Sequence, residues 1–204
     1  MNLYDIYTHF KMDYANVNLD TITLCKSGKS LKILNENKKP LEMQSCKLYM
    51  PFDVSRFENK WSGMYDYSVS CYTDDSFKEF FSKLDKRVSD LLSPFTESPL
   101  NDTLKQNKDF PKLFRLKLPR DSYGNFNVVV FDKNREKIML TEENIEEIFC
   151  KKQTFKCTFQ CEKISDWQGK SSILWQMTQA KLFDKDPIQP IEKSHIDYNK
   201  LMID

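Results

Sequence analysis

The chain has 204 residues and a formal net charge of +1, with 31 lysines and arginines against 30 aspartates and glutamates. A hydrophobic share of 40% and an aromatic share of 13% are typical of a folded protein with a sizeable core, and they exclude an intrinsically disordered chain. Because the total charge is almost balanced, only a local cluster of charge could indicate a polyanionic partner.

No basic segment followed by an apolar core opens the chain, and no window approaches the ~20 apolar residues of a membrane span. We therefore expect a soluble, intracellular protein without a membrane partner. The six cysteines should then be free thiols. The only histidines, His9 and His195, lie at opposite ends of the chain, so we expect neither a metal site nor a cofactor.

The first part of the chain reads as a series of short strands. Apolar residues alternate with polar ones in segments 20–25, 31–34, 43–52 and 65–71, and turn residues separate these segments. In the last of them, Tyr65, Tyr67, Val69 and Cys71 share one side.

The pattern then changes to helical spacing. Residues 73–76 offer N-cap candidates, Ser76 and Glu79 fit a capping box, and Pro94 ends the helix. The apolar stripe of this long amphipathic helix should cover a sheet. Its members are Phe77, Phe80, Phe81, Leu84, Val88, Leu91 and Leu92.

Strands resume after a polar connection at 93–111. Segment 113–118 places Arg115 and Lys117 on one side, residues 121–125 form a turn containing a glycine, and 126–131 is apolar on both faces. A short helix over 141–149 and two final strands, 155–161 and about 170–182, complete the domain. This order predicts a mainly β protein with helical decoration (α+β), namely an antiparallel OB-like barrel with extra strands and one long amphipathic helix.

We expect residues 1–184 to form a single domain and residues 185–204 a mildly acidic tail. The tail carries four acidic residues, or five when Asp184 before it is included, against three lysines, and it is a candidate docking site for partner proteins.

The sequence offers no assembled catalytic site. Two Gly-Lys-Ser triplets, at 28–30 and 169–171, lack the earlier glycine of a phosphate-binding loop and lead into strands rather than helices. A serine or cysteine nucleophile has no nearby histidine, and the glutamate pairs at 142–143 and 146–147 read as a solvated helix face. We therefore predict a protein that is not an enzyme.

One cluster of charge stands out between Leu104 and Arg120. It holds six basic residues and one acidic residue, a net +5. Basic side chains neutralise phosphates and exposed rings stack on unpaired bases, so their interleaving on one sheet face favours single-strand binding over an ordinary solvated strand.

Segment 166–183 is a hairpin whose turn carries Trp167 and Lys170. In its second strand, either the side with Trp175 or the side with Gln176 must face the core, and the alternation alone does not say which. We expect Trp175 to be mainly core and Trp167 mainly a contact residue.

The order of these features resembles the single-stranded DNA-binding proteins of nucleocytoplasmic large DNA viruses, an OB-fold group. The resemblance covers about 104–184 and lies in LFRLKLP (113–119), FNVVVFDKN (126–134), TFKCTFQCEKI (154–164) and LWQMTQAKL (174–182). It implies a non-enzymatic coat for single-stranded DNA in replication, recombination or repair, located in the host cytoplasm, a viral replication factory or the virion. It supplies no residue-level site.

From the chemistry of the residues we predict sequence-tolerant binding of single-stranded DNA, with a homo-oligomer as one possible assembly. The alternative is a β-rich interaction or virion-structural protein that binds no nucleic acid. The predicted nucleic-acid contacts are Trp61, Tyr65, Tyr67, Lys112, Arg115, Lys117, Arg120, Tyr123, Phe126, Trp167 and Lys170.

Overall fold

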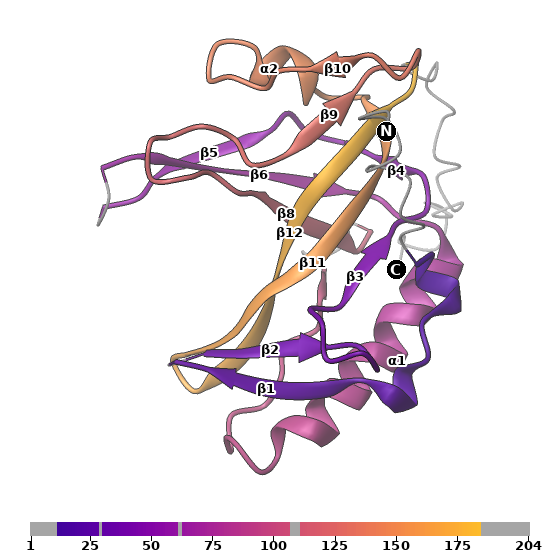
Figure 1. Ribbon diagram of the computed structural model, residues 1–204, viewed down its shortest axis with the longest axis vertical. Helices are drawn as coiled ribbons and strands as arrows, with labels where there is room; N and C mark the ends of the chain where they lie inside the picture. The colour runs from indigo at the N-terminus through magenta and orange to yellow at the C-terminus, as the bar shows by residue number, and fades with distance from the viewer. Residues whose placement is uncertain (1–11, 29, 61–62, 107–110, 185–204) are drawn as a thin grey trace, which may run out of the picture.

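The structure is a computed structural model that describes residues 12–28, 30–60, 63–106 and 111–184 (Figure 1). The predicted Trp61 contact and the predicted tail at 185–204 lie outside the described residues. The elements are η2 (Tyr14–Asn16), η3 (Leu19–Thr21), β1 (Thr23–Ser27), β2 (Ser30–Leu34), β3 (Glu42–Gln44), β4 (Leu48–Tyr49), β5 (Ser55–Glu58), β6 (Tyr65–Cys71), α1 (Asp75–Leu92), β7 (Leu104–Lys105), β8 (Leu113–Leu118), β9 (Val129–Phe131), β10 (Lys137–Ile138), α2 (Ile145–Ile148), β11 (Thr154–Trp167) and β12 (Lys170–Leu182).

The strands form one curved sheet in the order β1-β2-β11-β12-β8-β6-β5. Its spine is the long antiparallel hairpin of β11 and β12, which runs diagonally through the molecule in Figure 1. Short strands extend the sheet locally, since β3 and β4 pair with β11, β7 pairs with β8, and β9 pairs with both β12 and β10. The predicted extra strands beyond a five-stranded barrel are therefore present.

Strand direction differs from the prediction at two places. Instead of a wholly antiparallel barrel, the sheet is mixed, because β12 runs parallel to both β8 and β9. Segment 126–131 follows the predicted turn, yet only Val129–Phe131 forms a strand, and it pairs with β12 rather than with β8. A period of two identifies a strand but carries no information about its partner or direction.

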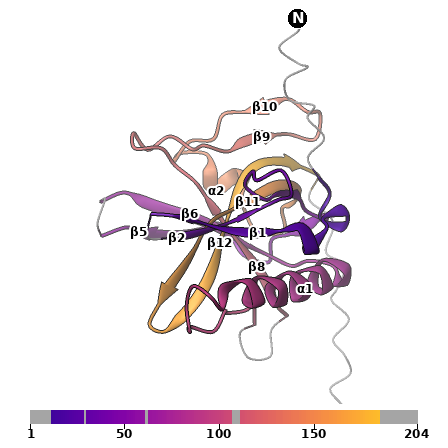
Figure 2. The same ribbon diagram turned by 60° about the horizontal axis from the view of Figure 1, so that its bottom comes forward.

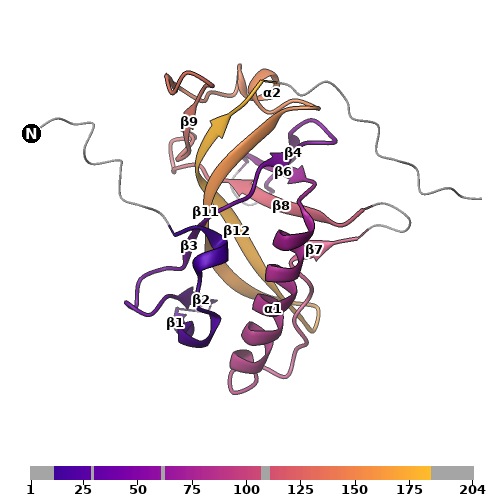
Figure 3. The same cartoon turned by 90° about the vertical axis from the view of Figure 1, so that its right-hand side faces the viewer.

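Helix α1 forms as predicted and lies along one side of the curved hairpin (Figure 3). Phe77 and Phe81 are fully buried, and Phe81 packs against Phe114 of β8 and Trp175 of β12, with ring centroids 4.9 and 5.6 Å apart. Phe159 of β11 completes this aromatic cluster, 5.1 Å from Phe114 and 5.4 Å from Trp175. Figure 2 shows α1 on one side of the sheet and the β9–β10 pair on the opposite side.

The N-terminus of α1 is capped two residues earlier than the capping-box pattern indicates. The carboxylate of Asp74, not the hydroxyl of Ser76, accepts a hydrogen bond from the backbone N–H of Phe77, at 2.7 Å. Asp74 has extended backbone angles, as an N-cap residue requires, whereas Ser76 already lies inside the helix.

This assignment predicts different costs for two alanine substitutions. Asp74→Ala should lower the free energy of unfolding by about 1 kcal/mol, because it leaves a helix N–H without its acceptor. Ser76→Ala is the matched control and should change it by less than about 0.5 kcal/mol. Urea unfolding followed by circular dichroism measures both, and a larger loss for Ser76→Ala would contradict the assignment.

Candidate nucleic-acid interface

The hairpin of β11 and β12 has one face in the core and one face turned away from it. Trp175 and Met177 are buried against the α1 side, with 3% and 0% exposure, so the alternating Leu174, Gln176 and Thr178 point the other way. The prediction that Trp175 belongs to the core is confirmed, and its indole N–H also donates to the hydroxyl of Thr103, at 3.3 Å. We call the opposite surface of the sheet the outer face. Its members include Phe57, Ser68, Arg115, Lys117, Gln160 and Gln176.

The tip of this hairpin presents an exposed ring beside a cation. Gln168 and Gly169 have φ values of 51° and 72°, as in a two-residue turn of type I′, and Trp167 and Lys170 are therefore cross-strand partners. The indole of Trp167 is 75% exposed. Ring and ammonium thus project together from the end of a rigid strand pair, as the sequence predicts.

On β8, Arg115 lies across the neighbouring strands of the outer face. Its Nε donates to the hydroxyl of Ser68 on β6 at 3.0 Å, and its guanidinium lies 5.8 Å from the ring centre of Phe57 on β5. The ring of Phe57 is 48% exposed. Phe57 is absent from the predicted contacts because its four-residue strand is too short to show a clear period, although an exposed aromatic in an edge strand is itself a signal.

Lys117 lies on the outer face but between two carboxylates. Its Nζ is 3.8 Å from Asp66 and 3.6 Å from Glu162. These residues line a groove of about 560 Å³. We call it the outer groove, and its floor includes Lys117, Gln160, Glu162, Gln176 and Thr178. Two carboxylates therefore surround the ammonium of Lys117, and it is a weaker phosphate ligand than the sequence suggests.

Three predicted contacts, Arg120, Tyr67 and Phe126, pack against one another rather than facing solvent. We call the place where they meet the barrel end. Arg120 pairs with Glu142 at 2.6 Å and donates to the carbonyls of Gly124 and Tyr65, at 2.6 and 3.0 Å. Its guanidinium also lies 5.6 Å from the ring of Tyr67 and 5.2 Å from that of Phe126.

Stacking by Tyr67 is therefore a wrong prediction, because its ring is 1% exposed and meets Phe126 edge-on at 5.3 Å. Phe126 is half-buried against the core. Arg120 has already committed its donors within the protein, so it holds the barrel end together rather than offering a free cation.

Two tyrosines near this end are exposed. Tyr65 is 40% exposed and stacks with the guanidinium of Arg56 at 4.6 Å, on the face of β6 opposite Lys117. Tyr123 is 89% exposed in the loop after Arg120. Both rings are accessible; Tyr65 borders the outer groove, whereas Tyr123 lines a different pocket.

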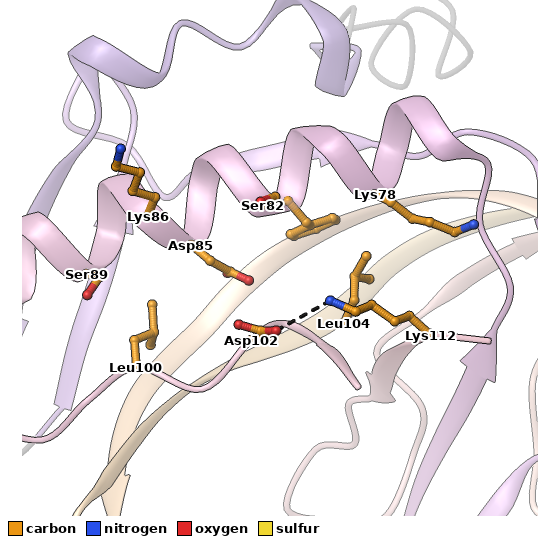
Figure 4. Close-up of a pocket in the computed structure, with 10 residues that line it drawn as sticks. Lys78, Ser82, Asp85, Lys86, Ser89, Leu100, Asp102, Leu104 and Lys112 are labelled. Carbon is orange, nitrogen blue, oxygen red and sulfur yellow. Dashed lines mark hydrogen bonds and ion pairs between the residues drawn. The ribbon is translucent and has the colours of Figure 1, made fainter. Parts of the chain in front are cut away.

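Lys112 belongs to a different surface altogether. It lies beside α1 in a pocket of about 310 Å³, 3.5 Å from Asp102 and close to Lys78 (Figure 4). The +5 cluster of the sequence is thus dispersed in the structure. Lys112 lies on a different surface from Lys117 and Arg120, and each of the three is paired with one or two carboxylates of its own. Lys108 lies outside the described residues.

The six cysteines are free thiols, as predicted. Burial raises the pKa of Cys46 and of Cys157 to about 12, so both remain protonated and act as small apolar side chains. Among the described residues, no group of three metal-ligating side chains is gathered at one point. No helix in the same ranges is long and apolar enough to cross a bilayer.

Comparison with known proteins identifies the fold. Neither protein-family models nor curated proteins yield a match to this chain. A solved structure of the single-stranded DNA-binding protein of bacteriophage Enc34 in complex with ssDNA matches with a TM-score of 0.51 at 10% identity, over 84% of this chain and 99% of that chain. A C-terminal truncation of the same protein matches with a TM-score of 0.48 at 13% identity, over 84% and 99% of the two chains.

The gp2.5 single-stranded DNA-binding protein of bacteriophage T7 gives a TM-score of 0.43 at 13% identity, over 74% of this chain and 96% of that one. At such low identity the first of these likenesses shows the fold alone. The chain has the mainly β mixed sheet with one long helix that is found in OB-fold single-strand-binding structures, and the predicted fold class is confirmed.

The pocket beside α1 also contains a carboxyl group that should make stability depend on pH. Figure 4 shows Asp85 in this pocket, and burial raises its pKa to about 6. The rise occurs although its oxygens accept two hydrogen bonds from Thr103, at 2.6 and 2.7 Å. Between about pH 4 and 6 the folded protein holds a proton that the unfolded chain has lost. Protonated Asp85 therefore contributes most to the free energy of unfolding below pH 4, and this contribution is lost as the pH rises through 6.

We expect the free energy of unfolding of the wild type to fall by up to about 3 kcal/mol over this range relative to Asp85→Asn. Asparagine can still accept from the Thr103 N–H and donate to its hydroxyl, so the variant should fold. Urea titrations at successive pH values measure the difference, and parallel pH profiles for the two proteins would contradict the assignment.

Proposed function

We propose that this protein binds single-stranded DNA across its outer face. The observation that carries the proposal is the exposed pair of Trp167 and Lys170, which shares a sheet face with Arg115 and Phe57. The proposal is supported by the fold, which is similar to that of a phage protein solved in complex with ssDNA.

In this mechanism, rings bind bases and cations bind phosphates. Trp167 stacks on an unpaired base, a contact worth roughly 1–3 kcal/mol that tolerates any base, while Lys170 neutralises an adjacent phosphate. Arg115 adds a second cation whose position is fixed by Ser68 and Phe57. Tyr65 and Tyr123 extend the accessible rings beyond the outer face.

The wider role follows the family resemblance. We propose a non-enzymatic coat for single-stranded DNA in the replication, recombination or repair of a large DNA virus, located in the host cytoplasm, a replication factory or the virion. Residues 1–184 would be the binding domain, and the acidic segment 185–204 would dock onto replication or repair proteins.

The stacking role predicts a specific loss of affinity. Trp167→Ala should weaken binding to oligo-dT by about tenfold, within the range of a lost base–ring stack. Fluorescence anisotropy measures the dissociation constant. Phe52→Ala, which removes another half-exposed ring, is the matched control and should bind like the wild type. Normal binding by Trp167→Ala, or equal affinity of the wild type for duplex and single strand, would remove stacking from the mechanism.

The phosphate contacts predict a change in salt dependence. The slope of log Kobs against log salt should be shallower by about 1.4 in the double variant Arg115→Ala and Lys170→Ala, at about 0.7 per phosphate on single strands. The pair Lys83→Ala and Lys86→Ala removes equal charge from α1 and should leave the slope unchanged. Identical slopes for both double variants would place the phosphates elsewhere.

An interaction or virion-structural role is the second candidate, because apolar side chains and a strand edge face solvent. Met139 is 81% exposed, and every residue of β5 is exposed. This candidate predicts stable oligomers without nucleic acid, whereas the binding role predicts a complex that forms only when oligonucleotide is added. Size-exclusion chromatography with light scattering distinguishes the two.

A further inference from the structure

The outer groove differs in chemistry from the hairpin tip. Three strands contribute to its floor in register, because Gln160 on β11 is paired with Gln176 on β12, and Gln176 is paired with Lys117 on β8. Side chains of β6 and of the 119–127 segment form its walls. Amides and carboxylates therefore form the floor of this space, and Tyr65 is the aromatic residue among those that line it.

Several of these polar groups have unused hydrogen-bonding capacity. Within the described ranges, neither side-chain amide of Gln160 and Gln176 forms a hydrogen bond to protein. Oε2 of Glu162 is buried and accepts no hydrogen bond, and its nearest ion-pair partner, the Nζ of Lys117, is 3.6 Å away. A desolvated carboxylate oxygen without a donor is costly, so this position favours a ligand that brings N–H groups.

The charge of the groove excludes phosphate from its floor. The two carboxylates of Asp66 and Glu162 outnumber the one ammonium of Lys117, and the guanidinium of Arg120 is already paired with Glu142. A strand that crosses the groove must therefore turn its bases inward and keep its phosphates toward solvent and the cations outside, such as Arg115 and Lys170.

We propose that the outer groove binds an unstacked guanine base of the single strand, an inference that rests on the proposed function and adds a base preference to it. Guanine carries two adjacent donors on its Watson–Crick edge, N1–H and N2–H₂, which match the two oxygens of a carboxylate, and Glu162 would meet them when its side chain turns the buried Oε2 into the groove. Gln176 and Lys117 donate to its O6 and N7 acceptors.

The other bases fit this set less well. Adenine and cytosine each offer one amino donor flanked by an acceptor that would face the carboxylate. Thymine offers a single N3–H between two carbonyl oxygens. Hypoxanthine, the base of inosine, is the sharpest comparison, because it differs from guanine only in lacking the N2 amino group.

The test measures anisotropy with three strands of about 20 nucleotides, longer than the roughly 4–16 that one OB-fold occupies. The strands are oligo-dT, alternating dT–dG and alternating dT–dI. We expect the wild type to bind dT–dG about fivefold more tightly than dT–dI, and dT–dI about as tightly as oligo-dT.

Glu162→Gln should reduce the ratio of dT–dG to dT–dI affinity toward one. Loss of a negative charge raises affinity for every strand alike, so the ratio isolates the hydrogen bonds. Glu143→Gln makes the same chemical change on an exposed turn before α2 and should keep the wild-type ratio. Gln176→Ala is a second groove variant, and it too should lower the ratio.

Equal affinity of the wild type for dT–dG and dT–dI would overturn the guanine site while leaving single-strand binding intact. An unchanged ratio in Glu162→Gln would overturn the role of that carboxylate. Failure to bind any of the three strands would refute the proposed function itself.

Discussion

The packing of α1 on three strands decides how the rest of the molecule is presented. Phe77 and Phe81 meet Phe114, Phe159 and Trp175, which come from β8, β11 and β12. Side chains alternate along a strand, so burying these rings on one face turns Arg115, Gln160 and Gln176 to the other. A slip of one residue in any of the three strands would exchange its core and outer sets.

The charge that a ligand meets on the outer face is set by individual residues there and not by the net charge of the chain. The chain is almost neutral, and several of its cations are tied to carboxylates, as Lys117 is to Asp66 and Glu162. The affinity of such a surface for a polyanion depends on the few cations outside these pairs and on ring contacts. The same carboxylates give the outer groove a hydrogen-bonding character that a purely basic surface lacks.

Aromatic residues serve two purposes in this fold, and burial separates them. Tyr67 and Phe126 pack with Arg120 and close the barrel end, where they contribute to stability. Trp167 and Phe57 lie on a hairpin tip and an edge strand, where their rings are accessible. The cation beside a ring does not distinguish the two cases, since Arg115 and Arg120 both lie over aromatics.

Features set by neighbours along the chain were predictable from the sequence. Helical spacing located α1, and the Trp-Gln-Gly-Lys segment located the hairpin tip. Alternation along the last strand predicted that either Trp175 or Gln176 faces the core. The tertiary structure alone decided that β12 runs parallel to β8 and β9, that the +5 cluster disperses, and that Tyr67 is buried. These outcomes depend on contacts between residues far apart in sequence, for which periodicity and local composition carry no information.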